Sequence, residues 1–199
     1  MEDFPKGIII LTTGRAGSSM TAGVFERHGV WCGPSRMQPS QWNAKGFFQN
    51  GTLHKLMKDY HGRDIEGPVI EKAIPAWIEE AKNIMLYQGM KPPWFFKTGA
   101  HYYKCMKPLV DKVVKIYRPF EQVMDSYRRC IFLPFQKWNV AHIVQQQMDY
   151  MEELPGVFVN TEELAQGDLS SLEDAFDYCG LDFDKKIAEA FIDPNLFSI

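Results

Sequence analysis

The sequence lacks the features that identify several classes of protein at first sight. Its four cysteines, Cys32, Cys105, Cys130 and Cys179, lie far apart and form no CxxC pair. This spacing argues against a structural zinc site and favours reduced thiols in a cytoplasmic protein. The start, MEDFPKG, is acidic, and the apolar run after it is too short for a signal peptide or a membrane span. We therefore expect a soluble, cytoplasmic protein with no membrane partner.

An excess of positive charge is also absent. The chain has 22 Lys and Arg against 25 Asp and Glu, a net charge of −3. A general nucleic-acid-binding protein needs a broad basic surface, so we expect no nucleic-acid partner and only a local anion site. The 199 residues, 45% of them hydrophobic, can bury one sizeable core. They predict one domain over residues 1–199, and they do not indicate its oligomeric state.

Strand-like and helix-like patterns alternate along the chain. Apolar, β-branched runs predict buried strands, and apolar residues at helical spacing predict helices between them. The expected strands cover residues 7–13, 30–32, 94–98, 112–117 and 156–161. The expected helices begin at Ser18 and Pro119, cover residues 51–61, 73–87 and 140–151, and include two more after the last strand.

This alternation predicts an α/β three-layer sandwich. Its central sheet would be mostly parallel, with four to five strands, as in P-loop NTPases. Ligands of such sheets bind beyond the carboxyl ends of the strands. Candidate functional residues are therefore sought there.

The stretch IIILTTGRAGSSMTAG, residues 8–23, resembles a phosphate-binding loop that has lost its lysine. A Walker loop, GxxxxGK[ST], places lysine on the outer phosphates and a hydroxyl on magnesium. Here only two residues separate Gly14 from Gly17, Ser18 stands at the lysine position, and the basic residue is Arg15, inside the loop. The loop is therefore unlike that of a magnesium-dependent ATP enzyme.

The loop still has what is needed to bind an anion. The backbone N–H groups of Ala16 to Ser19 would lie at the start of a helix, where anions bind. Arg15 adds a planar, permanently charged fork, and Ser18 and Ser19 add hydroxyl donors. We predict an anion site that needs no metal ion. The alternative is a plain strand-to-helix turn in which Ser18 is the N-cap.

A second anion-binding element is predicted at KIYRPFEQVMDS. Arg118 stands at a strand end, and Ser126 follows two helical turns later. A helix beginning near Pro119 would place Ser126, Gln122 and Arg129 together, away from the apolar stripe. The arginine and the serine could then bind a second phosphate. Each of them alone is more often a solvated surface residue.

Together and in this order, the two elements resemble those of sulfotransferases that use 3′-phosphoadenosine 5′-phosphosulfate (PAPS). The first motif of that family, P-[KR]-S-G-[TS]-[TS], holds the 5′-phosphosulfate, and GRAGSS departs from it at Gly14 and Ala16. The matching positions are Arg15, Gly17, Ser18 and Ser19.

The second family motif is an arginine at a strand end with a serine eight positions later, and it holds the 3′-phosphate. Arg118 and Ser126 match this spacing, although Arg118-Pro119 is one residue tighter than the usual Arg-[Asp/Asn]-Pro. The segments NAKGFFQN and GVFVNTEELAQGDLSSLEDAFDYCGL also resemble bacterial and phage-type members. The resemblance covers most of the chain.

The resemblance implies in-line transfer of a sulfuryl group from PAPS to a hydroxyl or amine, leaving adenosine 3′,5′-bisphosphate. The acceptor would be a small molecule or a glycan. Arg15 and the loop amides would hold the leaving group, and Lys97 would contact the transition state. Two alternatives stay open: an inactive, nucleotide-binding relative, and a P-loop small-molecule kinase, which would need a lysine at position 18.

A base must also take the proton of the acceptor. Many family members have a histidine in K-T-H; in this chain KTGAH offers His101, two places later. Gln49 stands where related sequences usually have a glutamate, and an amide cannot act as a base. His101 is the first candidate, and His54 and Glu71 remain open.

Overall fold

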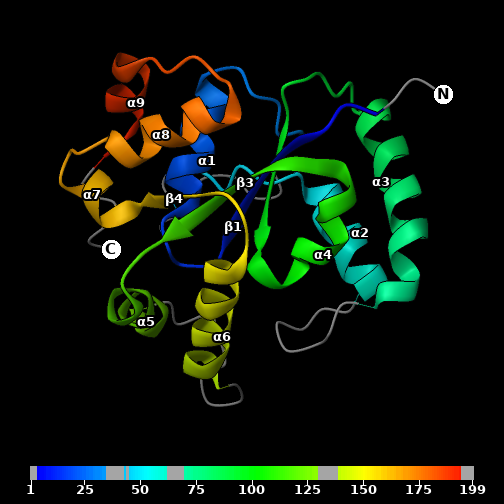
Figure 1. Cartoon of the computed structure of the whole chain (residues 1–199), viewed down its shortest axis with the longest axis horizontal. Coiled ribbons are helices and arrows are strands. Elements are labelled where there is room, and N and C mark those ends of the chain that lie inside the picture. The colour runs from blue at the N-terminus through cyan, green and yellow to red at the C-terminus, as the bar shows by residue number, and fades with distance from the viewer. Residues whose placement is uncertain (1–3, 35–42, 44, 62–69, 130–138, 194–199) are drawn as a thin grey trace.

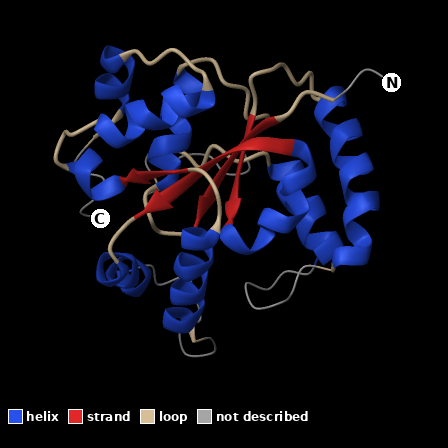
Figure 2. Cartoon of the chain, in the orientation of Figure 1, coloured by secondary structure: helices blue, strands red, loops and turns tan. Residues whose placement is uncertain are grey.

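The computed structural model describes residues 4–34, 43, 45–61, 70–129 and 139–193. Within this part of the chain, four strands form one parallel sheet in the order β2-β1-β3-β4, and helices flank it (Figure 1). Figure 2 shows the strands as a twisted layer between two groups of helices. The predicted α/β fold with a parallel central sheet is confirmed. The strands are β1 (Gly7–Thr12), β2 (Phe95–Gly99), β3 (Val110–Tyr117) and β4 (Val157–Asn160).

The central strand β1 is buried along its whole length because strands pair with both of its edges and an apolar core covers each of its faces. Thr12 pairs with Gly99 of β2, and Leu11 pairs with Lys115 of β3. The carboxyl ends of the strands therefore meet at one edge of the sheet. The strand expected at residues 30–32 is wrong, because only Trp31 pairs there, in a single bridge to Trp94.

The alternation of side chains along β1 separates two apolar cores. Ile8 and Ile10 belong to the first core, and Ile9 and Leu11 belong to the second. The first is completed by α1 (Ser18–Arg27), α8 (Ser170–Cys179) and α9 (Lys185–Phe191). The second is completed by α2 (Gly51–His61), α3 (Ile74–Tyr87) and α4 (Tyr103–Met106).

The remaining helices lie mostly beyond the strand ends. In Figure 1, α5 and α6 lie on the side to which the strand arrows point. These helices are α5 (Phe120–Arg129), α6 (Val140–Glu153) and α7 (Thr161–Ala165), with 3₁₀ turns η1 (Glu71–Ala73), η2 (Ala100–Tyr102) and η3 (Lys107–Leu109). Of the helices described, none is long and apolar enough to cross a bilayer.

The predicted helices are confirmed to within one or two residues at their ends, apart from the end of the chain. Three helices, not two, follow β4 in the described residues. The additional helix forms because the Asn160 side chain accepts a hydrogen bond from the Glu162 N–H, which ends the strand and begins α7. Cys32, Cys105 and Cys179 are free thiols, as expected, and Cys130 lies outside the described residues.

Gly156 lets β4 approach β3 closely. Its φ is +108°, and a Cβ there would lie 2.0 Å from the carbonyl oxygen of Val113. We expect Gly156→Ala to lower the free energy of unfolding by about 2–5 kcal/mol, from left-handed strain together with the clash. Urea denaturation measures this loss.

Gly167→Ala is the matched control. Gly167 also has a left-handed φ, +85°, but nothing lies within 4 Å of an added Cβ. This variant should lose only the backbone cost of about 1–2 kcal/mol. Equal losses in the two variants would contradict a tight β3–β4 approach at Gly156.

Candidate functional site

The loop between β1 and α1 is held in an unusual backbone conformation. Gly14, Arg15 and Gly17 have φ values of +74°, +55° and +85°. A left-handed φ costs a non-glycine residue such as Arg15 about 1–2 kcal/mol, and such strain concentrates at functional sites. Gly17 is the N-cap of α1, and no side chain of the described residues caps this helix. Ser18 is therefore not the N-cap that the alternative of a plain turn assigned to it.

The loop and the second element that the sequence predicts to bind an anion are in direct contact. Arg15 Nε donates a hydrogen bond to Ser126 Oγ at 3.1 Å, across 111 positions of the sequence. Arg118 Nη1 donates to the carbonyl oxygen of Arg15 at 3.2 Å, and Arg118 Nε donates to Gln122 Oε1 at 3.2 Å. The two arginines and the serine that the sequence singles out therefore form one cluster.

This cluster carries concentrated positive charge. Arg118 is only 8% exposed, and its pKa is lowered by burial first and then by the nearby charges of Arg129 and Arg15; Glu162 opposes this shift. Among the described residues, no carboxylate lies within ion-pairing distance of Arg15 or Arg129. Guanidinium groups gathered in this way favour a bound anion.

Lys97 joins the loop from the neighbouring strand. Its side chain, on β2, is 2% exposed, and Nζ donates to Ser19 Oγ at 2.8 Å. Burial lowers the pKa of Lys97 to about 7, although the nearby Cys32 thiol acts to raise it. The amine therefore titrates near neutral pH, and an anion in the loop would favour its charged form.

His101 lies just past the end of β2, in η2. Gly99, two residues before it, pairs with Thr12 at the start of the loop. Both ring nitrogens of His101 are buried, and neither has a hydrogen-bond partner among the described residues. Burial and the charge of Lys58 lower its pKa to about 4. The imidazole is therefore neutral at pH 7, although no carboxylate orients it within the described part of the chain.

The other candidate bases have different surroundings. His54 lies half-buried on α2. Glu71 lies in η1, is 70% exposed and pairs with Lys104 at 3.1 Å. An exposed carboxylate that already pairs with a lysine is poorly placed to take a proton from a bound acceptor. Of the three, only His101 has both ring nitrogens buried without a hydrogen-bond partner in the described residues.

Two residues that contact the loop are absent from the sequence-based prediction of the site. Tyr127 donates its hydroxyl to the Thr13 carbonyl oxygen at 2.9 Å. Thr161 Oγ1 lies 3.0 Å from the carbonyl oxygens of both Ala16 and Tyr117. The sequence indicates Tyr127 only as part of an apolar stripe, and Thr161 only as a strand-end residue.

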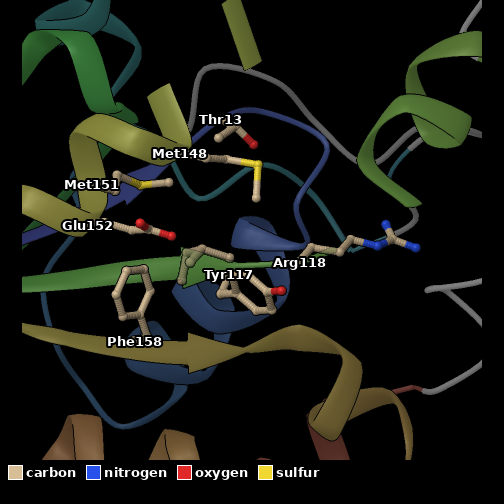
Figure 3. A pocket seen from close by; sticks show the side chains of 8 residues that line it. Thr13, Tyr117, Arg118, Met148, Met151, Glu152 and Phe158 are labelled. Carbon is tan, nitrogen blue, oxygen red and sulfur yellow. The ribbon is translucent and has the colours of Figure 1, made fainter. Parts of the chain in front are cut away.

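A small pocket opens beside the cluster, between α6 and the ends of β3 and β4 (Figure 3). The rings of Tyr117 and Phe158 lie edge to face, 6.4 Å apart, on its wall. Figure 3 shows the Arg118 guanidinium pointing away from the other lining side chains. The lining residues are Thr13, Ile116, Tyr117, Arg118, Met148, Met151, Glu152 and Phe158. In the described residues, no three His, Cys, Asp or Glu side chains form a group that could hold a metal ion.

The fold is similar to that of two solved sulfotransferase domains. The domain from the Synechococcus PCC 7002 olefin synthase has a TM-score of 0.55 and 15% identity, over 98% of this chain and 82% of that one. The domain from the curacin biosynthetic pathway has a TM-score of 0.55 and 12% identity, over 92% and 76%. No protein-family model matches the sequence, and neither does any curated protein. At this identity the similarity shows a sulfotransferase-like fold.

The buried His101 should make the protein less stable in acid. Its pKa falls from 6.5 to about 4 on folding, so the unfolded chain binds the proton more readily in this range. The stability that His101 contributes is complete above pH 6.5 and is lost as the pH falls toward 4, by about 1.4 kcal/mol per pH unit at most. His101→Phe should flatten this slope in urea titrations at several pH values.

His142→Phe is the control, because His142 is exposed on α6. It should keep the acid slope of the wild type. His61 is also buried with a lowered pKa, so His101→Phe should reduce the slope without removing it. An unchanged slope in His101→Phe would show that His101 is not buried in its neutral form.

Proposed function

We propose that this protein is a sulfotransferase that moves a sulfuryl group from PAPS to a hydroxyl or amine. The observation that carries the proposal is the contact between Arg15 and Ser126, with Arg118 bonded to the Arg15 carbonyl. This contact brings the loop after β1, which is suited to bind one anionic group, next to the end of β3, which is suited to bind a second. A nucleotide with anionic groups at both its 5′ and 3′ positions fits such a pair.

The chain's own groups suit each end of this donor. Arg15, the amides at the start of α1 and the hydroxyls of Ser18 and Ser19 would bind the 5′-phosphosulfate. Arg118 and Ser126 would bind the 3′-phosphate and so fix the position of the sulfuryl group. The guanidinium cluster, with no carboxylate paired to Arg15 or Arg129 in the described residues, fits this nucleotide.

Catalysis would come mainly from positive charge placed where the leaving group becomes negative. Arg15 and the loop amides would stabilise the departing phosphate oxygen. Lys97 is bonded to Ser19 beside the loop, and it would add a further charge once anion binding has raised its pKa. Removing one such donor typically lowers a rate by about 10²–10³-fold. A sulfuryl group carries less charge than a phosphoryl group, so these cations can serve without a divalent ion.

His101 is the proposed base. Its ring is neutral at pH 7, so one ring nitrogen can take the proton from the hydroxyl or amine of the acceptor as that group bonds to sulfur. A pKa of about 4 makes it weak in the free protein, and a developing negative charge nearby would raise that value. The acceptor itself is proposed only by class, as a small molecule or a glycan.

A second candidate is a nucleotide-binding module that transfers nothing. Gln49 at the position of a glutamate and the unoriented His101 ring favour it. A small-molecule kinase is disfavoured by Ser18 at the lysine position. Nucleotide titration distinguishes a kinase from a sulfotransferase or a nucleotide-binding module. A screen of acceptors then distinguishes the sulfotransferase from the module.

Calorimetric titration with adenosine 3′,5′-bisphosphate, without magnesium, tests the site directly. We expect Arg118→Ala to weaken binding about 10–100-fold, because a hydrogen bond to a charged group contributes about 1.5–3 kcal/mol. Adenosine 5′-phosphate lacks the second phosphate, so in Arg118→Ala it should lose clearly less affinity than the bisphosphate, through the lost contact with the Arg15 carbonyl oxygen alone.

Arg128→Ala is the matched control. Arg128 lies on the neighbouring α5, is 62% exposed and pairs with Asp125. It should bind the bisphosphate like the wild type. Binding of ATP only with magnesium, or equal losses in the Arg118 and Arg128 variants, would contradict the proposal.

Lys97 should take up a proton when the nucleotide binds. With a pKa of about 7 it is mostly neutral at pH 8.5, and the bound anion would recharge it. Calorimetry at pH 8.5, in buffers of different ionisation enthalpy, should show about one proton taken up, and affinity should fall as the pH rises from 7.5 to 9.5.

Lys97→Met should remove this proton uptake. Lys115→Met is the control, since Lys115 is equally buried but donates to the Leu154 carbonyl oxygen. It should retain the uptake. Proton uptake that persists in Lys97→Met would show that another group carries the charge.

A further inference from the structure

Three carbonyl groups of the anion loop are held by side chains from other elements. Tyr127 on α5 bonds to the Thr13 oxygen, and Arg118 bonds to the Arg15 oxygen. Thr161, the first residue of α7, bonds to the Ala16 oxygen at 3.0 Å. A trans peptide points its C=O and its following N–H in opposite directions. A side chain that holds one of these oxygens therefore also fixes the direction of the N–H of the next residue, which points away from that oxygen.

The first of these peptides behaves in this way. The Thr13 oxygen accepts from Tyr127, and the N–H of the same peptide, that of Gly14, donates to Thr12 Oγ1 at 3.1 Å. The other two fixed peptides join Arg15 to Ala16 and Ala16 to Gly17, so their N–H groups belong to Ala16 and Gly17. These are amides at the entry to α1, where an anion would bind.

Thr161 differs from the other two because it also contacts the strand end that carries Arg118. Its Oγ1 lies 3.0 Å from the carbonyl oxygen of Tyr117, the last residue of β3. One hydroxyl proton is thus shared between the loop and the residue before Arg118. The side chain is 1% exposed, so water does not replace it.

The start of α7 is itself fixed. The Asn160 side chain accepts the Glu162 N–H at 3.0 Å, and Asn160 still pairs with Tyr117 in the sheet. Thr161 is therefore a rigid contact between the two halves of the site, placed by β4. Valine has nearly the same shape but no hydroxyl, and serine keeps the hydroxyl.

We propose that Thr161 is a positioning residue that aims the Ala16–Gly17 peptide and sets the spacing between the loop and Arg118. It thereby gives the site its preference for nucleotides with two phosphate groups. This inference rests on the proposed function for its ligand, but the peptide orientation exists without any nucleotide.

The first test measures this preference. Wild type, Thr161→Val and Thr161→Ser are titrated with adenosine 3′,5′-bisphosphate and with the 3′- and 5′-monophosphates. We expect Thr161→Val to bind the bisphosphate about tenfold more weakly, with about a threefold loss or less for each monophosphate. Thr161→Ser should stay within about twofold of wild type. A general loss of structure would weaken all three ligands alike, and an unchanged preference in Thr161→Val would overturn the proposal.

The second test needs no nucleotide. Amide NMR shifts of Ala16 and Gly17 are compared in wild type and both variants, alone and with inorganic sulfate. Thr161→Val should move these two signals, Thr161→Ser should restore them, and Gly29, at the far end of α1, should not change. Unmoved Ala16 and Gly17 signals would overturn the positioning role. If the wild type bound no nucleotide, the proposed function would fail, and the amide shifts would still decide this inference.

Discussion

The site depends on holding like charges together against their mutual repulsion. Arg118 lies in a buried position where Arg15 and Arg129 both disfavour its charge. Neutral acceptors compensate in part: the Arg15 carbonyl and Gln122 accept from Arg118, and Ser126 accepts from Arg15. The sheet order β2-β1-β3-β4 makes this possible, since it puts the loop after β1 directly beside the end of β3. Burial of both faces of β1 thus stabilises an arrangement that is unfavourable in electrostatic terms alone.

The parts of this arrangement that are local in sequence could be predicted from it. The strand, loop and helix around Arg15 follow from an apolar run, a glycine turn and an apolar helical face, and the start of α1 at Ser18 was predicted correctly. The strand predicted at residues 30–32 is absent, because a short apolar run forms a strand only where a partner pairs with it along its length, and here only Trp31 pairs. The short helix α7 was missed because the Asn160 cap was not distinguished from a strand residue.

Contacts between distant segments could be predicted only where a motif links them. The spacing of Arg118 and Ser126 indicated a shared ligand, and the structure then brings both to Arg15. Thr161 belongs to no such pattern. Its bond to the Ala16 carbonyl spans 145 positions and depends on β4 lying beside β3, which a single sequence does not specify. The burial of His101, and with it the low pKa, likewise follows from packing between elements rather than from its neighbours in the chain.

The lowered pKa values of Lys97 and His101 would serve the proposed reaction in different ways. With a pKa of about 7, Lys97 is only partly charged near neutral pH in the free site, and a bound anion would favour its charged form. In its proposed role as a base, His101 must be neutral before the acceptor loses its proton, and a pKa lowered to about 4, mainly by burial, keeps it neutral at pH 7. A lysine whose charge increases when an anion binds and a histidine that is neutral at pH 7 would both suit the proposed transfer. A module that only binds a nucleotide would need the first of these and has no use for the second. The proposed transfer therefore needs a neutral ring nitrogen such as those of His101, just past the end of β2, and a binding module does not.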